Sequence, residues 1–137
     1  MVGRAIKLLS CVVLMLSATA RNVPAGRSIL PFTDDLDQAL EQAASAGKPV
    51  VLVFIAVWCP NCQRMEKTTF TDPVIARHAD DLVWVMVDID RHLALAHQYN
   101  VEAVPVTFLL DPGGQRRASL VGLVGAAQLD AQLATML

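Results

Sequence analysis

Two cysteines at the end of a long apolar run constrain this chain more than any other feature. Residues 50–57 are all apolar, and the motif Trp-Cys-Pro-Asn-Cys follows at residues 58–62. An apolar run without polar alternation is typical of a strand buried on both faces, as in the middle of a parallel sheet. The residues after the motif, 63–70, have helical character. The sequence therefore predicts a buried strand that delivers Cys59 and Cys62 to the start of a helix.

The start of a helix suits a reactive cysteine. Free N–H groups and the positive end of the helix dipole meet there, and both favour an anion such as a thiolate. About one helical turn separates Cys59 from Cys62, so the two sulfurs lie within reach of each other. We interpret Cys59 as the attacking sulfur and Cys62 as the resolving one. The same spacing occurs in zinc sites, but His78, His92 and His97 are scattered, so we predict no metal site.

Residues 1–20 have the layout of a secretory signal peptide. Arg4 and Lys7 precede an uncharged, mostly apolar run at 8–20, which closes on a small-x-small site. That run is shorter than the roughly 20 residues needed to cross a bilayer. We predict cleavage after Ala20; the alternatives are an uncleaved anchor and a buried first helix.

The rest of the chain divides into a lead-in linker at 21–31 and one domain at 32–137. A length of 137 residues allows one domain and not two. Cleavage after Ala20 would remove Arg4 and Lys7, which leaves nine of the 11 basic residues and all 13 acidic ones. The net charge of the cleaved chain would be about −4. The sequence contains no basic patch that would indicate a nucleic-acid partner. We expect a monomer.

Helices and strands alternate through this domain, which places it in the α/β class. The predicted helices cover residues 34–46, 63–67, 74–79, 91–99 and 126–137, and the predicted strands cover 50–56, 82–88, 104–110 and 117–121 with a short edge strand at 29–30. Strands joined by helices indicate parallel crossovers, whereas the turn at 111–114 indicates an antiparallel hairpin. We expect a central mixed sheet of four to five strands with helices on both faces, and Asp90 as the cap of helix 91–99.

These motifs, in this order, resemble the thioredoxin superfamily over nearly the whole expected domain. The resemblance is carried by the motif at 58–62, by Val104-Pro105, by the turn at 111–114 and by Gly122. It implies the thioredoxin fold. Within the superfamily, residues 62–73 are similar to the C-terminal periplasmic domain of DsbD and its small single-domain relatives. That group receives electrons and reduces disulfides in other secreted proteins.

The resemblance also implies roles for three residues around the cysteines. Pro105 is expected to follow a cis peptide bond, and the backbone of Val104 is expected to pair with an extended substrate segment. Trp58 is expected to lie beside the active site and shape substrate access. The residues alone leave alternatives open, since Pro105 could open an edge strand in trans and Trp58 could simply pack in the core.

Two departures from the family pattern bear on the chemistry. Val53 stands where many members carry a buried Asp that assists proton transfer to the second cysteine. Glu66 lies one turn after Cys62 on the same helix face, so it is our candidate for tuning the cysteines. A carboxylate there disfavours the Cys59 thiolate; the alternative is a solvated surface acid. The two residues between the cysteines, at 60–61, differ from the Gly-Pro that is familiar in the family. The redox potential of family members is therefore not carried over to this chain.

Together these features predict an exported thiol:disulfide oxidoreductase, periplasmic if the source is bacterial. It would reduce disulfides in other secreted proteins without an organic cofactor. A membrane or thiol electron donor would restore the dithiol, since a bacterial periplasm is kept oxidising. The alternatives are a disulfide oxidant or isomerase, and a thioredoxin-fold adaptor or metallochaperone that is not an enzyme.

Overall fold

The computed structural model describes residues 29–137. The predicted signal peptide at 1–20 and the first part of the lead-in, 21–28, lie outside the described residues. Among the helices that the structure does describe, none is both long and apolar enough to span a bilayer.

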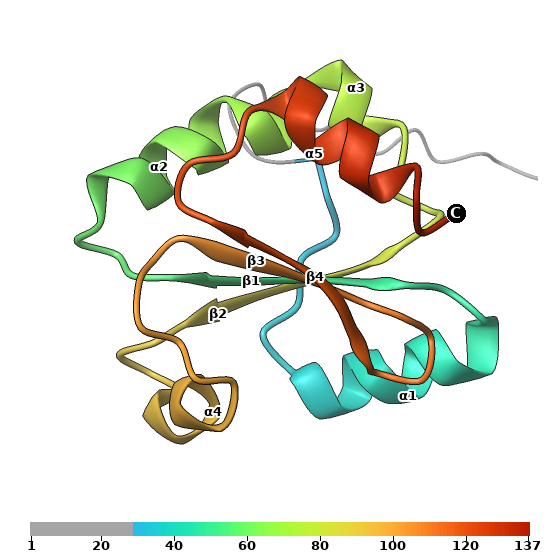
Figure 1. The fold of residues 1–137 in the computed structure, drawn as a ribbon, viewed down its shortest axis with the longest axis horizontal. Coiled ribbons are helices and arrows are strands. Elements are labelled where there is room, and N and C mark those ends of the chain that lie inside the picture. The colour runs from blue at the N-terminus through green and yellow to red at the C-terminus, as the bar shows by residue number, and fades with distance from the viewer. Residues whose placement is uncertain (1–28) are drawn as a thin grey trace, which may run out of the picture.

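Four strands form one mixed sheet in the order β2-β1-β3-β4 (Figure 1). The strands are β1 (Val50–Ile55), β2 (Val83–Asp88), β3 (Val106–Leu110) and β4 (Arg116–Val121). Strand β1 pairs in parallel with β2 and antiparallel with β3, and β3 pairs antiparallel with β4. The expected mixed sheet of four to five strands is confirmed.

Helices cover both faces of this sheet, as expected for the α/β class (Figure 1). Helices α1 (Leu36–Ala46) and α4 (Leu93–Gln98) lie on one face, while α2 (Pro60–Lys67), α3 (Pro73–Ala76) and α5 (Ala126–Leu133) lie on the other. A short 3₁₀ turn, η1 (Thr69–Thr71), joins α2 to α3. Helix α3 is shorter than the predicted 74–79.

The caps that the sequence indicates are present. The side chain of Asp35 accepts a hydrogen bond from the N–H of Gln38 at the start of α1, and Gly47 ends that helix at φ 66°. A left-handed residue at a helix end favours glycine, because any Cβ is strained there. Asp72 accepts from the N–H of Val74 at the start of α3.

Strand β1 is apolar throughout because both of its faces are covered. Successive side chains of a strand point to opposite faces. Leu52 and Phe54 therefore join the core beneath α1 and α4, whereas Val51 and Val53 join the core beneath α2, α3 and α5. Its central position explains why the run carries no polar alternation.

The helices between strands predicted parallel pairing of the central strands, and this prediction is wrong for β3. Phe54 of β1 faces Val106, the first residue of β3, and Val50 faces Leu110. Helix α4 has six residues and is about 9 Å long, too short to carry the chain back along a strand of nearly 20 Å. The chain therefore enters β3 at the carboxyl end of β1 and runs the opposite way.

The predicted edge strand at 29–30 is also wrong. Leu30 is buried in the core beneath α2, α3 and α5, which takes the chain away from the sheet edge at that point. The contact with the sheet comes later, where Thr33 forms a single parallel bridge to Val85 of β2. The N–H of Thr33 donates to the carbonyl of Trp84 at 3.1 Å.

An ion-pair cluster joins α5 to the turn after α3. Arg77 donates two hydrogen bonds to the carboxylate of Asp130, at 2.7 and 2.8 Å. The imidazole of His78 lies 2.7 Å from the same carboxylate. The bond from His78 has the largest effect and those from Arg77 the next largest, and together they hold the pKa of Asp130 below its usual value.

The lowered pKa predicts a pH-dependent contribution of Asp130 to stability. A carboxylate whose folded pKa is depressed stabilises the fold above its unfolded pKa of about 4, and this contribution is lost as the pH falls through the folded value. Asp130→Asn should therefore lower the unfolding midpoint by a few degrees at pH 7. The difference from wild type should shrink below pH 4. Thermal melts followed by circular dichroism from pH 3 to 7 measure it, with exposed Asp80→Asn as control; a constant difference would contradict the prediction.

Candidate active site

Helix α2 positions both cysteines. Cys59 is its N-cap residue and Pro60 its first residue, a place where a missing N–H costs nothing. The Sγ atom of Cys59 accepts the N–H of Cys62 at 3.2 Å, a bond that favours the thiolate. Both cysteines are free thiols, with 4% of Cys59 and 0% of Cys62 exposed. The predicted placement of the pair at a helix start is confirmed.

The loop before β3 lies against this pair. The peptide bond between Val104 and Pro105 is cis, as the resemblance implied. The thiol of Cys59 lies 3.7 Å from the carbonyl oxygen of Val104, to which it donates. The structure thus brings Val104, and with it Pro105, to Cys59 from a position more than 40 residues along the chain.

Trp58 lies at the surface, so the alternative that it packs in the core is wrong. Its side chain is 65% exposed, and the indole Nε1 donates to the carboxylate of Asp90 at 2.8 Å. The prediction that Asp90 caps α4 is wrong. His92 is the N-cap residue, and its side chain makes no capping hydrogen bond. The sequence did contain a signal for this contact, because Asp90 is an acid that closely follows a strand. The carboxyl ends of β1 and of its parallel neighbour β2 lie at the same edge of the sheet, which brings Asp90 near Trp58.

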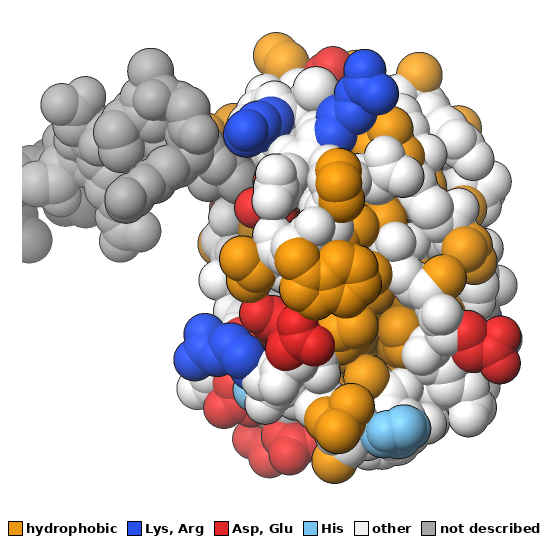
Figure 2. Space-filling view, turned by 90° about the vertical axis from the view of Figure 1, so that its left-hand side faces the viewer, with side chains coloured by type: hydrophobic (Ala, Val, Ile, Leu, Met, Phe, Trp, Pro, Cys, Tyr) orange, Lys and Arg blue, Asp and Glu red, His pale blue; other side chains and the backbone are white. Residues whose placement is uncertain are grey.

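An apolar surface surrounds the cysteines. Figure 2 shows apolar side chains gathered in the middle of the face where β1 ends and α2 begins. Val57 and Trp58 are among the most exposed of them. Beside Trp58 lies a groove of about 300 Å³ that is also lined by Ile89 and by residues 101–104. The groove places Trp58 and Val104 on the same concave surface.

Burial sets the electrostatics of the second cysteine. It raises the pKa of Cys62 to about 12, with the hydrogen bond and charge of Cys59 and the charge of Glu66 adding to the rise. Glu66 is itself partly buried, which raises the pKa of its carboxyl against the opposing charge of Lys67. The charge of Glu66, which was expected to act on Cys59, disfavours the thiolate of Cys62, one turn away.

Glu66→Gln should therefore lower the pKa of Cys62. Removing the carboxylate removes a charge that opposes the thiolate, and the shift should be smaller than the effect of burial, because Glu66 is the smallest contributor to the rise. The measurement is the pH dependence of the Cys62 Cβ chemical shift, followed by NMR in a Cys59→Ser background. Glu41→Gln, on the exposed surface of α1, is the control. An unchanged titration profile would reject this role of Glu66.

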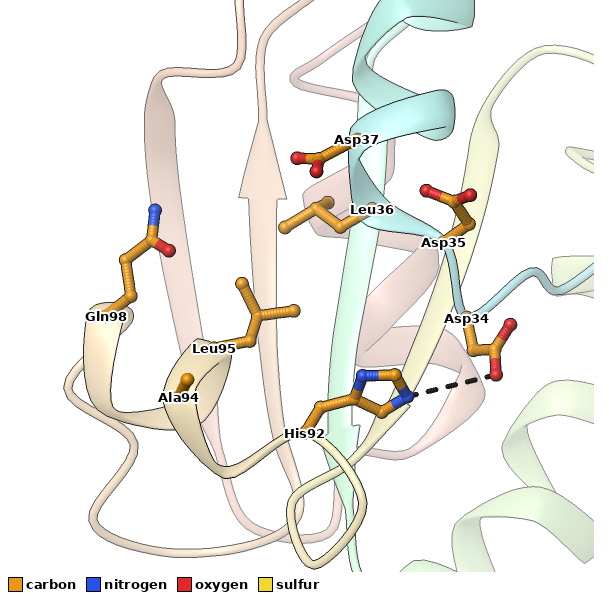
Figure 3. A pocket seen from close by; sticks show the side chains of 8 residues that line it. All are labelled: Asp34, Asp35, Leu36, Asp37, His92, Ala94, Leu95 and Gln98. Atoms are coloured by element: carbon orange, nitrogen blue, oxygen red, sulfur yellow. Dashed lines mark ion pairs between the residues drawn. The ribbon is translucent and has the colours of Figure 1, made fainter.

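A second hollow, of about 500 Å³, lies between the start of α1 and α4 (Figure 3). Its acids are Asp34, Asp35 and Asp37, and the imidazole of His92 lies 3.9 Å from Asp34. Asp35 and Asp37 point away from His92 (Figure 3). Across residues 29–137, no group of three or more His, Cys, Asp or Glu side chains could hold a metal ion.

The sequence and the fold of this chain have counterparts in known proteins. DsbD of Salmonella paratyphi A, a thiol:disulfide interchange protein, is 36% identical over 106 residues, covering 73% of this chain and 18% of DsbD. The chain thus spans less than a fifth of the length of that relative. Thioredoxin H-type of Brassica oleracea is 33% identical over 111 residues, covering 78% of this chain and 85% of that protein.

Solved structures agree with these sequence matches. The C-terminal domain of Neisseria meningitidis DsbD in its oxidised form superposes with a TM-score of 0.65 at 28% identity, covering 74% of this chain and 93% of that one. A thioredoxin from Thermus thermophilus superposes with a TM-score of 0.69 at 26% identity, covering 77% of this chain and 85% of that one. The family model of the thioredoxin-like domain matches residues 36–137. This chain therefore belongs to the thioredoxin-like family.

Proposed function

We propose that this protein is an exported reductase of disulfides in other proteins, which works through Cys59 and Cys62. Its class, a thiol–disulfide oxidoreductase, follows from its family and its cysteine pair. The observation that carries the proposal is the contrast between the two thiols. Cys59 caps a helix, where an amide N–H supports its thiolate, while Cys62 is fully buried behind it.

This contrast suits a two-step exchange. The Cys59 thiolate attacks one sulfur of a substrate disulfide, the S–S bond breaks, and a mixed disulfide forms as the other substrate sulfur leaves. Cys62 then loses its proton and attacks the Sγ atom of Cys59. The second substrate sulfur leaves, so the substrate gains two electrons and the pair becomes a disulfide.

We assign substrate binding to the surface around Cys59. The carbonyl of Val104 accepts a hydrogen bond from the Cys59 thiol, and a cis peptide bond joins Val104 to Pro105. These contacts support pairing between the backbone of Val104 and an extended substrate segment. Trp58 offers an exposed ring, fixed by Asp90, against which apolar substrate side chains can pack.

The direction and the location rest on different observations. The relative from Salmonella paratyphi A is named a thiol:disulfide interchange protein, which supports exchange with other thiols and disulfides. The resemblance of residues 62–73 to the C-terminal domain of DsbD supports the reductive direction. We propose that a membrane or thiol donor re-reduces the pair, since a bacterial periplasm is kept oxidising. The signal-peptide pattern at 1–20 supports export, to the periplasm if the source is bacterial.

The equilibrium reduction potential of the pair tests the direction. We expect a value near the −270 mV or so of thioredoxin, together with turnover of insulin disulfides. A value near the roughly −120 mV of DsbA would identify an oxidant and overturn the proposal. Stoichiometric metal uptake by the reduced protein, with negligible turnover, would instead identify a metallochaperone. Cys59→Ala is the control for turnover.

A further inference from the structure

Glu102 is the charged residue of the groove beside Trp58. The other described residues that line this groove are uncharged, namely Trp58, Ile89, Val101, Ala103 and Val104. The side chain of Glu102 is exposed, and within residues 29–137 its carboxylate takes part in no hydrogen bond or ion pair. At about 300 Å³ the groove suits one side chain of a peptide rather than a whole cofactor. A free carboxylate beside apolar walls favours a side chain that is both apolar and cationic.

The indole ring of Trp58 is a second group that attracts a cation. The ring is 65% exposed, and the face of an indole carries partial negative charge to which ammonium and guanidinium groups bind. Its Nε1 atom donates to the carboxylate of Asp90 at 2.8 Å, which places a further negative charge at the edge of the ring. The ring and the carboxylate of Glu102 therefore favour the same kind of side chain.

Two arginines line neighbouring hollows but not this groove. Arg116 lines a hollow of about 290 Å³ that shares residues 101–103 with the groove. Its guanidinium lies 3.8 Å from the centre of the Phe108 ring and donates to the carbonyl of Tyr99 at 3.1 Å. Arg91 lines a third hollow. Neither arginine forms an ion pair with Glu102, so the groove keeps its negative charge.

The groove begins at the cysteine that we assign as the attacking one. Val104, which lines the groove, accepts a hydrogen bond from the Cys59 thiol at 3.7 Å, and Trp58 directly precedes Cys59. A substrate sulfur that Cys59 attacks therefore brings its neighbouring residues over the groove. An extended chain advances about 3.3 Å per residue, so side chains one or two positions from the substrate cysteine reach the groove.

We propose that Glu102 makes this protein prefer substrates with a lysine or arginine within two residues of the cysteine that Cys59 attacks. The proposal rests on the redox function proposed above and names a class of substrate for it. The apolar stem of such a side chain packs on Ile89 and Val101, while its charged end meets the carboxylate of Glu102. An acidic side chain at the same place is repelled. Glu102 touches neither reacting sulfur, so it sets specificity and not the chemical step.

Reduction of short peptides tests this preference. The substrates are disulfide-linked peptide dimers that differ only in carrying lysine or glutamate on both sides of the cysteine. The reduced full chain is mixed with each peptide, the reaction is stopped with acid, and the released peptide thiol is quantified by liquid chromatography. The measured quantity is the lysine-to-glutamate ratio of the second-order rate constants. A charge beside a cysteine also changes the reactivity of the disulfide itself, so this ratio is compared between protein variants that meet the same peptides.

In E102Q we expect the ratio to fall about fivefold at low salt, because an exposed attraction and an exposed repulsion each contribute roughly twofold. E102K should lower the ratio further, since it repels lysine and attracts glutamate. Glu41→Gln removes an exposed carboxylate from α1 and should keep the wild-type ratio. In about 0.5 M sodium chloride the differences between variants should shrink, because salt screens exposed charges.

The other outcomes overturn the proposal in distinguishable ways. Equal ratios in the wild type, E102Q and E102K would show that Glu102 does not select substrates, while reduction of both peptides would leave the redox function standing. A change of ratio that persists undiminished in high salt would identify an effect of shape and not of charge, which also overturns the proposal. If the wild type reduces neither peptide although dithiothreitol reduces both, the proposed redox function itself fails.

Discussion

Cys59→Ala should abolish disulfide reduction, with turnover at least about a thousandfold below wild type. The variant loses the sulfur that we propose attacks the substrate, and Cys62 cannot replace it because that thiol is fully buried and strongly disfavoured as a thiolate. The measurement is insulin reduction in the presence of dithiothreitol. Residual turnover in Cys59→Ala that depends on Cys62 would contradict the assignment of the two sulfurs.

Cys62→Ala is the matched variant, because it removes the second step and leaves the first. It should form mixed disulfides through Cys59 that persist, since no neighbouring thiol resolves them. Non-reducing gels followed by mass spectrometry detect these adducts and locate the bond. If no adducts accumulate on Cys59 with any protein disulfide, the two-step exchange is wrong.

Trp84→Ala should be the most destabilising single change outside the active site, at roughly 3–5 kcal/mol. Trp84 is 1% exposed in β2, packs edge-to-face on Phe32 with ring centroids 5.7 Å apart, and donates its indole N–H to the carbonyl of His78. Truncation leaves a large cavity and removes the hydrogen bond between the indole and that carbonyl. Because small domains are stable by about 5–15 kcal/mol, such a loss removes a large part of the total.

Trp58→Ala provides the control of the same residue type. Trp58 is mostly exposed, so its loss should change the free energy of unfolding by about 0.5 kcal/mol or less. Urea unfolding followed by circular dichroism compares the two variants without relying on tryptophan emission. Equal losses would show that burial does not set the energetics of these two side chains.

Local patterns predicted most of the site. The apolar run at 50–57 predicted the buried strand, and proline directly after Cys59 is typical of the first position of a helix. Asp111 predicted the hairpin turn, where its carboxylate accepts the N–H groups of Gly113 and Gln115. The resemblance to a family added the cis bond at Pro105, which the residues alone left open.

Pairings between distant residues were missed or wrong. The sequence predicted a parallel β3 and a capping role for Asp90, whereas the short α4 reverses the strand and Trp58 takes the carboxylate.

The sequence by itself determined that Cys59 and Cys62 stand at a helix start after a buried strand, because apolar periodicity and caps act over a few neighbouring residues. The tertiary structure alone decided what lies beside them: the carbonyl of Val104, and the ring of Trp58 held by Asp90. These partners depend on strand order and register, which arise from packing the whole core at once.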